Sequence, residues 1–141
     1  MRRLRRFVRA SWAERFLLLR ALFVVCLTRL GLWLLPIGAV RRIALRTGKT
    51  TRVSHPVPRL VWAVKAVSRF VPLATCLTQA LALQWLLSRS GHTSRVHLGA
   101  RRDAAGKFEA HAWVECEDRV VIGGPEAHEY VPLAAWQKSS G

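Results

Sequence analysis

The sequence has few cysteines and no paired cysteine motif. Cys26, Cys76 and Cys116 lie far apart, without a Cys-x-x-Cys. An odd number with this spacing argues against a disulfide framework and indicates a reducing cytosol. The spacing also fits no compact zinc pattern, so a metal site built from Cys76, His111 and Cys116 is not expected. No cofactor is expected either.

A long uninterrupted apolar run is missing as well. Arg20 and Arg29 divide the apolar stretch 16–40 into runs of eight and eleven residues, whereas a membrane-spanning helix needs about 20 apolar residues. No short apolar run precedes a small-residue cleavage site, so a signal peptide is not expected. There is no internal repeat, and 141 residues suit one compact domain with appended helices.

Acidic residues are scarce. The chain has 8 Asp and Glu against 23 Lys and Arg, a formal charge of +15. Residues 1–50 contain twelve basic residues and one acid, Glu14, which gives 12 − 1 = +11 for this segment. This charge predicts attraction to phosphates, anionic lipid or acidic peptide.

The first 50 residues have a helical pattern. Ser11 and Glu14 have the spacing of a capping box, so a helix is predicted to begin there. It would be buried on one broad side and end or bend at Gly31 and Pro36, and a second helix is expected over 37–46. The proposed buried stripe consists of Phe16, Leu19, Leu22, Phe23, Cys26, Leu27 and Leu30. The polar, proline-containing segment 47–58 is interpreted as a linker, which divides a basic helical extension, 1–50, from a core domain, 58–141.

The core domain is predicted to combine helices with antiparallel strands. A short helix follows Pro58, and Thr75 can cap a second helix that begins with Cys76 and ends near Gly91. Alternating apolar and polar residues then predict strands at 95–101, 108–116 and 119–122, with turns at 103–107 and 117–118 and one more short apolar element at 130–133. The fold class is therefore α+β.

Cys76 and His111 are the candidate catalytic pair. A thiol attacks only as the thiolate, and the backbone N–H groups at a helix start favour that form. His111 lies on the polar face of the 108–116 strand and can act as the general base. Spacing alone also fits a buried structural Cys76 and a surface His111. Cys26 and Cys116 are expected to be structural.

The segments Thr75-Cys-Leu-Thr-Gln-Ala-Leu-Ala-Leu-Gln-Trp-Leu-Leu87 and Ala110-His-Ala-Trp-Val-Glu115 resemble the small stand-alone transglutaminase-like leader peptidases of lasso peptide biosynthesis. The resemblance covers about Leu60 to Leu133. It implies a papain-like core, with a cysteine-bearing helix on an antiparallel sheet, and cleavage of the amide between the leader and the core of a precursor peptide. It also implies a separate leader-recognition protein and the lasso cyclase as partners.

The third catalytic residue does not carry over from this family. Its members orient the histidine with an Asp on the next strand, but a two-residue turn at 117–118 places Gly124 opposite His111, with Gly123 beside it. Glu126 is the favoured carboxylate, while Asp118 lies at the turn, about 20 Å away along the strand. A backbone carbonyl, or no third group, stays open.

Other functions remain possible from the sequence. An acyltransferase or transglutaminase would use the same Cys–His pair. A nucleic-acid-binding module would explain the arginines, but no known reading motif is present and no nucleic-acid partner is expected. Residues 1–45 also suit peripheral contact with a membrane surface, which is compatible with catalysis.

Overall fold

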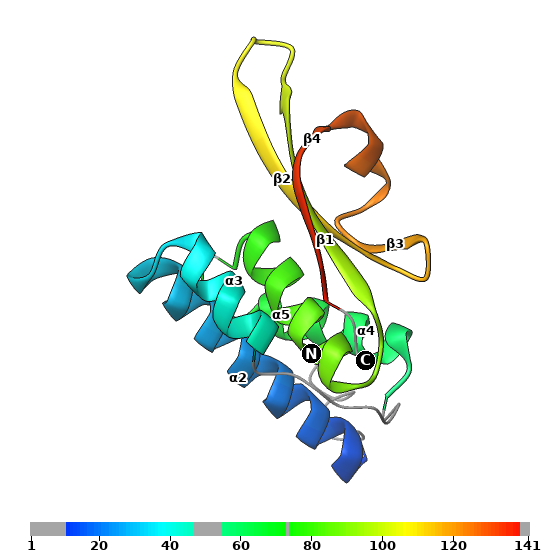
Figure 1. Cartoon of the computed structure of the whole chain (residues 1–141). Coiled ribbons are helices and arrows are strands. Elements are labelled where there is room, and N and C mark those ends of the chain that lie inside the picture. Colours follow the sequence, from blue (N-terminus) through cyan, green and yellow to red (C-terminus); the bar gives the residue numbers. More distant parts are fainter. Residues whose placement is uncertain (1–10, 47–54, 73, 139–141) are drawn as a thin grey trace, which may run out of the picture.

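The computed structural model describes residues 11–46, 55–72 and 74–138. A layer of helices covers one face of a four-stranded antiparallel sheet, and the hairpin between the two longest strands projects beyond this layer (Figure 1). The predicted α+β class is therefore confirmed. The helices are α2 (Trp12–Leu34), α3 (Ile37–Arg46), α4 (Val57–Ser68) and α5 (Cys76–Arg89).

The sheet has the strand order β3-β2-β1-β4. The first three strands follow one another as a meander, and the last strand returns to pair with β1. A short 3-10 helix, η1, connects β3 to β4. The bounds are β1 (Ser94–Arg102), β2 (Phe108–Cys116), β3 (Arg119–Ile122), η1 (Pro125–Glu129) and β4 (Val131–Lys138).

Local sequence signals account for most element boundaries. The Ser11 hydroxyl accepts the N–H of Glu14, whose carboxylate accepts the N–H of Ser11, so the predicted capping box is formed. The turn between β2 and β3 has positive φ at both Glu117 (54°) and Asp118 (58°), as a two-residue type I′ turn requires. Asp103 accepts the N–H groups of Ala105 and Lys107 and so closes the hairpin between β1 and β2.

One hydrophobic core, the helix-side core, lies between the helices and the sheet. It includes Leu17 and Val25 of α2, Val64 of α4, Leu83 of α5 and Val114 of β2. The helices on both sides of the predicted 47–58 linker thus contribute to the same core. Residues 47–54 of that segment lie outside the described residues.

The buried side of α2 is not the side that the sequence predicts. Phe16, Leu19 and Phe23 of the predicted buried stripe are exposed, as is Cys26. The helix is apolar on nearly every side, so its periodicity does not identify which side is buried. It also continues through Gly31 and ends at Leu34, just before Pro36. The buried side consists of Leu17, Leu18, Ala21, Val24 and Val25.

Candidate active site

The start of α5 has unused hydrogen-bond donors. Thr75 caps the helix: its hydroxyl accepts the N–H of Thr78 at 3.4 Å and its carbonyl accepts the N–H of Gln79 at 3.0 Å. Among the described residues, this leaves the N–H groups of Cys76 and Leu77 without an acceptor. Two adjacent free donors at a helix N-terminus can stabilise a thiolate or an oxyanion.

Cys76 is the first residue of α5, as the sequence predicts. Its side chain is half-buried, packs against the helix-side core, and has no hydrogen-bond partner among the described residues. The neighbouring Gln79 does not point its amide toward a free site, because its side-chain nitrogen donates to the carbonyl of Ala74 at 3.4 Å. The thiol is therefore the reactive group that this helix start presents.

His111 is held by a backbone carbonyl. Its Nε2 lies 2.7 Å from the carbonyl oxygen of Gly123, in the chain that follows β3. A carbonyl oxygen only accepts hydrogen bonds, so Nε2 must carry the proton of this bond. In the neutral imidazole the lone pair is then on Nδ1. The structure therefore assigns Nδ1 as the atom that can accept a proton.

Gly123 is needed for this contact. Its φ is +106°, and a Cβ at this position would lie 2.3 Å from Cβ and 2.8 Å from Cα of Trp113. Only glycine lets the chain after β3 pass so close to β2. The close passage brings the Gly123 carbonyl to the imidazole of His111.

Aromatic rings fix the plane of the imidazole. His111 stacks against Tyr130 with ring centroids 4.9 Å apart and against Trp113 at 6.2 Å. Trp113 and Tyr130 are buried together with Ala127 in a second apolar cluster, the outer cluster, so Trp113 is a packing residue. A Cβ at Gly99 would lie 2.8 Å from Cβ of Tyr130, so glycine makes room for this cluster on β1.

Cys76 and His111 pack on different faces of the sheet, at levels that the lengths of α5 and β1 make similar. Figure 1 shows α5 and β1 running side by side in opposite directions, joined by a short turn. The 14 residues of α5 rise about 21 Å. A strand covers this length in about six residues. Counted from Ser94, the first residue of β1, about six residues lead to Ala100, which is next to Gly99, the partner of His111. The thiol packs on the helix-side core, whereas the imidazole packs with the outer cluster.

The edge of β2 next to His111 has no paired strand among the described residues. Strand β3 pairs only with Val114 to Cys116, and a bulge shifts its register between Val114 and Glu115. No β3 residue is therefore paired with the part of β2 that contains His111.

The candidate third residue, Glu126, lies in η1. Its side chain is outside the described part of the chain, so its role stays a prediction. The described acceptor of the His111 ring is the Gly123 carbonyl, one of the alternatives left open by the sequence. Cys116 pairs with Arg119, as a two-residue turn at 117–118 requires, but the register shifts between Val114 and Glu115, so the expected placement of Gly124 opposite His111 is wrong.

The comparison with protein families decides the family. The model of the Transglutaminase-like superfamily matches residues 17–135, most of the chain. The chain belongs to the transglutaminase-like superfamily. No similar protein was found among curated proteins or solved structures.

The transglutaminase-like superfamily includes cysteine peptidases and transglutaminases. Members of both groups form acyl-thioester intermediates on a cysteine, which agrees with a thiol at a helix start and a histidine on a strand. The matched region begins within α2, so this helix is part of the superfamily domain. Its buried residues accordingly share the core of α5.

The other two cysteines of this transglutaminase-like chain differ from Cys76. Cys26 is exposed on α2, and Cys116 is buried at the end of β2, where its Sγ donates to the carbonyl of Thr93 at 3.4 Å. Burial, with a smaller contribution from Glu117, raises the pKa of the Cys116 thiol, which keeps it protonated and unreactive. Among the described residues, no group of His, Cys, Asp and Glu could hold a metal ion.

Proposed function

We propose that this protein is a cysteine peptidase that removes the leader from a lasso precursor peptide, with Cys76 as nucleophile and His111 as general base. The observation that carries the proposal is a thiol in the first turn of α5 beside two unused N–H donors, in a chain of the transglutaminase-like superfamily. The leader-recognition protein and the cyclase are proposed as partners on the basis of the resemblance in residues 60–133.

The reaction proceeds in two acyl-transfer steps. Nδ1 of His111 takes the proton of Cys76, and the thiolate attacks the carbonyl carbon of the amide between leader and core. The N–H groups of Cys76 and Leu77 stabilise the resulting oxyanion. The imidazolium then protonates the departing amine of the core peptide, and water, deprotonated by His111, hydrolyses the thioester and releases the leader.

The pair requires a movement of the part of β2 that contains His111. Because the thiol and the imidazole lie on different faces, the imidazole and the Gly123 segment that holds it must move together when the precursor binds, so that Nδ1 keeps its lone pair as it reaches Cys76. Ala110, which shares the helix-side face with Ala112, is exposed, so the sheet surface beyond the helices is open to an extended peptide. A peptide strand laid on the edge of β2 would follow a common mode of peptide recognition.

The proposed activity is tested by incubating the purified full-length chain with a synthetic precursor, with and without the recognition protein, and reading the products by mass spectrometry. We expect Cys76→Ala to abolish cleavage and His111→Ala to reduce it strongly. Cys26→Ala and Cys116→Ala are matched controls and should retain most activity. Cleavage by Cys76→Ala at the wild-type rate would refute the proposal, whereas equal loss in all three cysteine variants would point to misfolding.

The contact between thiol and imidazole has its own test. The rate of Cys76 alkylation by iodoacetamide, measured against pH in the presence of the precursor, reports the thiolate. If Nδ1 reaches the thiol, His111→Ala shifts this profile to higher pH. An identical profile in the variant and the wild type would remove His111 from the site.

A further inference from the structure

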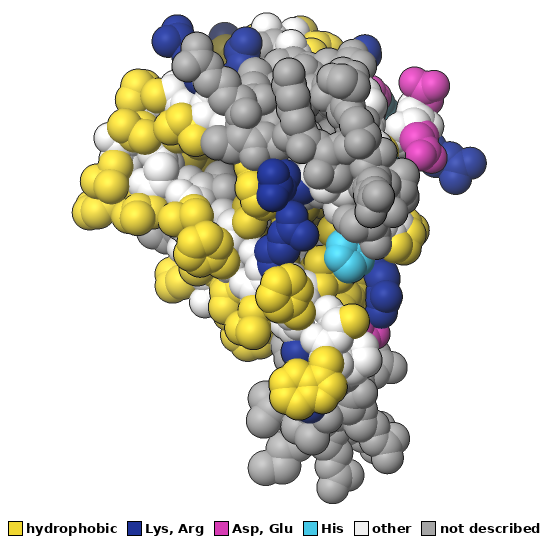
Figure 2. Space-filling model, turned by 60° about the horizontal axis from the view of Figure 1, so that its bottom comes forward, with side chains coloured by type: hydrophobic (Ala, Val, Ile, Leu, Met, Phe, Trp, Pro, Cys, Tyr) yellow, Lys and Arg dark blue, Asp and Glu magenta, His cyan; other side chains and the backbone are white. Residues whose placement is uncertain are grey.

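A row of large apolar side chains is exposed along the whole length of α2. We name this row the α2 stripe. Trp12 is 85% exposed, Phe23 64% and Trp33 73%. Figure 2 shows hydrophobic side chains gathered on one face of the molecule, with Lys and Arg side chains beside them. The α2 stripe consists of Trp12, Phe16, Leu19, Phe23, Leu27, Leu30, Trp33 and Leu34.

The α2 stripe is too long and too apolar for an ordinary soluble surface. A helix of 23 residues is about 34 Å long, and soluble monomers rarely expose continuous apolar patches of more than a few hundred Å². The stripe continues into an apolar groove of about 590 Å³ between α2, α3 and α5, with Val40, Leu81 and Trp85 in its wall. Such a surface marks an interaction site.

The opposite side of α2 shows how the helix can meet its partner. Although Arg20 and Arg29 interrupt its apolar run, α2 is long and apolar enough to cross a membrane by length and composition. However, Leu17, Ala21 and Val25 on its other side are buried in the helix-side core. Spanning would remove them from that core. With one side packed on the domain and the other exposed, α2 is suited to lie in the plane of a membrane surface.

The charges around the α2 stripe are positive. Arg20 and Arg89 both lie over the ring of Trp85, at 5.7 and 5.5 Å from its centroid, where this residue lines the groove. Neither arginine has a carboxylate partner among the described residues. Glu14, the one acid of α2 and α3, is bound to Arg59 at 3.0 Å and caps α2. An apolar surface beside these two arginines is complementary to anionic phospholipid. The acyl chains match the apolar side chains, and the phosphates match the arginines.

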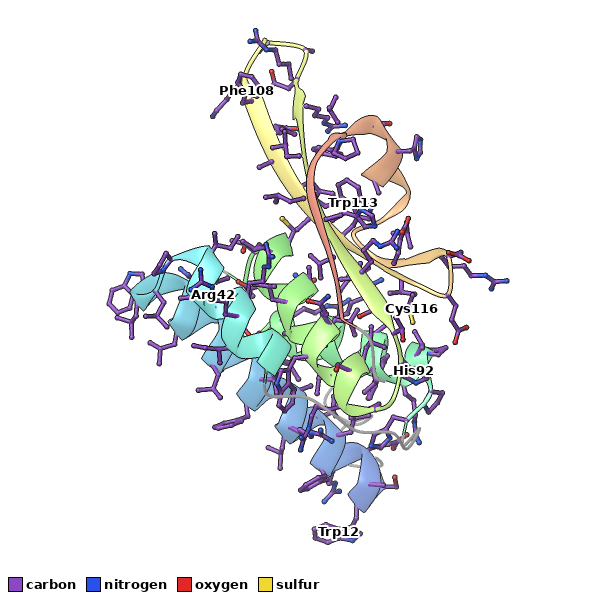
Figure 3. The ribbon with its side chains drawn as sticks, viewed as in Figure 1. Trp12, Arg42, His92, Phe108, Trp113 and Cys116 are labelled. Carbon is purple, nitrogen blue, oxygen red and sulfur yellow. The ribbon has the colours of Figure 1, made fainter. Side chains whose placement is uncertain are left out.

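We propose that the α2 stripe docks in the plane of an anionic phospholipid bilayer. The apolar side chains enter the boundary between headgroups and acyl chains, and Arg20 and Arg89 contact lipid phosphates. Trp12 and Trp33, at the two ends of the stripe, have the amphipathic rings that are enriched at membrane interfaces. This orientation leaves the hairpin of β1 and β2 away from the lipid, because Trp12 and Phe108 lie at opposite ends of the molecule (Figure 3).

The test is co-sedimentation of the full-length protein with vesicles of phosphatidylcholine alone and of equal parts phosphatidylcholine and phosphatidylglycerol. We expect binding to the anionic vesicles that weakens as salt is raised, and little binding to the neutral ones. Phe23→Asp and Leu19→Asp should each lower the binding constant roughly tenfold or more, because they remove an inserted apolar group and add a negative charge. The matched control is Phe108→Asp, at a side chain that is 67% exposed at the far end of the molecule, and it should bind like the wild type.

Several outcomes would overturn the proposal. These are no binding to anionic vesicles at low salt, equal binding to neutral vesicles, and equal losses in Phe23→Asp and Phe108→Asp. Resistance to extraction with alkaline carbonate would show a spanning helix instead. Self-association that Phe23→Asp abolishes, without vesicle binding, would assign the stripe to a protein interface. Because Cys76→Ala should bind vesicles normally, this result is independent of the proposed peptidase activity.

Discussion

Replacing Gly123 with alanine tests the contact that holds the candidate base. A Cβ at this position would lie 2.3 Å from Cβ of Trp113, which is shorter than any allowed contact distance, so the chain after β3 must move away from β2. Alanine at a φ of +106° adds backbone strain of about 1–3 kcal/mol, and overpacking adds about 1–3 kcal/mol more. The free energy of unfolding should therefore fall by about 2–6 kcal/mol.

The neighbouring Gly124 provides a matched control. Its φ is +73°, but a Cβ there would meet nothing within 4 Å, so Gly124→Ala should show only the backbone part of the loss, about 1–3 kcal/mol. The two variants are compared by urea denaturation, using the midpoint at unchanged slope. Equal losses in both would refute the close approach of Gly123 to Trp113.

The same pair of variants separates the effect on His111 from the effect on stability. Movement of the Gly123 carbonyl removes the acceptor of Nε2–H, so the imidazole no longer keeps its lone pair on Nδ1. Under conditions where both variants are folded, kcat for precursor cleavage should fall in Gly123→Ala and stay near the wild-type value in Gly124→Ala. A normal kcat in folded Gly123→Ala would show that this carbonyl does not orient the base.

Two further predictions concern the cap of α5 and the third catalytic residue. Thr75→Ala should lower the free energy of unfolding by about 1 kcal/mol, because the N–H of Thr78 loses its acceptor. Thermal denaturation measures this loss, with Thr75→Ser as the control. An unchanged melting temperature in Thr75→Ala would contradict the cap. Glu126→Gln should slow turnover strongly if the carboxylate orients His111, and steady-state kinetics identical to the wild type would remove Glu126 from the site.

Local signals in the sequence were sufficient for much of this fold. The capping box at Ser11, the threonine before Cys76 and the turn at 117–118 each act within a few residues, so their effects are visible in the sequence. The alternation in β2 likewise places Trp113 on one face and Val114 on the other, as the structure confirms.

Features that depend on tertiary packing were not predictable in this way. The buried side of α2 is selected by its contacts with α4 and α5, because the helix offers apolar side chains in nearly every direction. The bulge at Val114 shifts the register that simple counting from the turn gives. The partner of His111 is a main-chain carbonyl, which every residue has, so no side-chain pattern could point to it. The paired glycines at 123–124 were the available signal, since glycine permits a close approach of two chain segments.

The packing of α2 also leads to a prediction about truncation. The predicted division at the linker implies that the core domain, residues 58–141, folds alone. However, removing α2 would expose the surface that five buried side chains of this helix now cover, including Leu17 and Val25. Four of these five side chains are large, and at about 1.5–3 kcal/mol for each of them the loss is on the order of 6–12 kcal/mol, comparable to the whole stability of a small domain. The truncated chain should therefore lack a cooperative thermal transition by near-ultraviolet circular dichroism, whereas a chain of residues 11–141 should keep it. A cooperative transition in the shorter chain would show that α2 is an appended helix and that the core of α5 is complete without it.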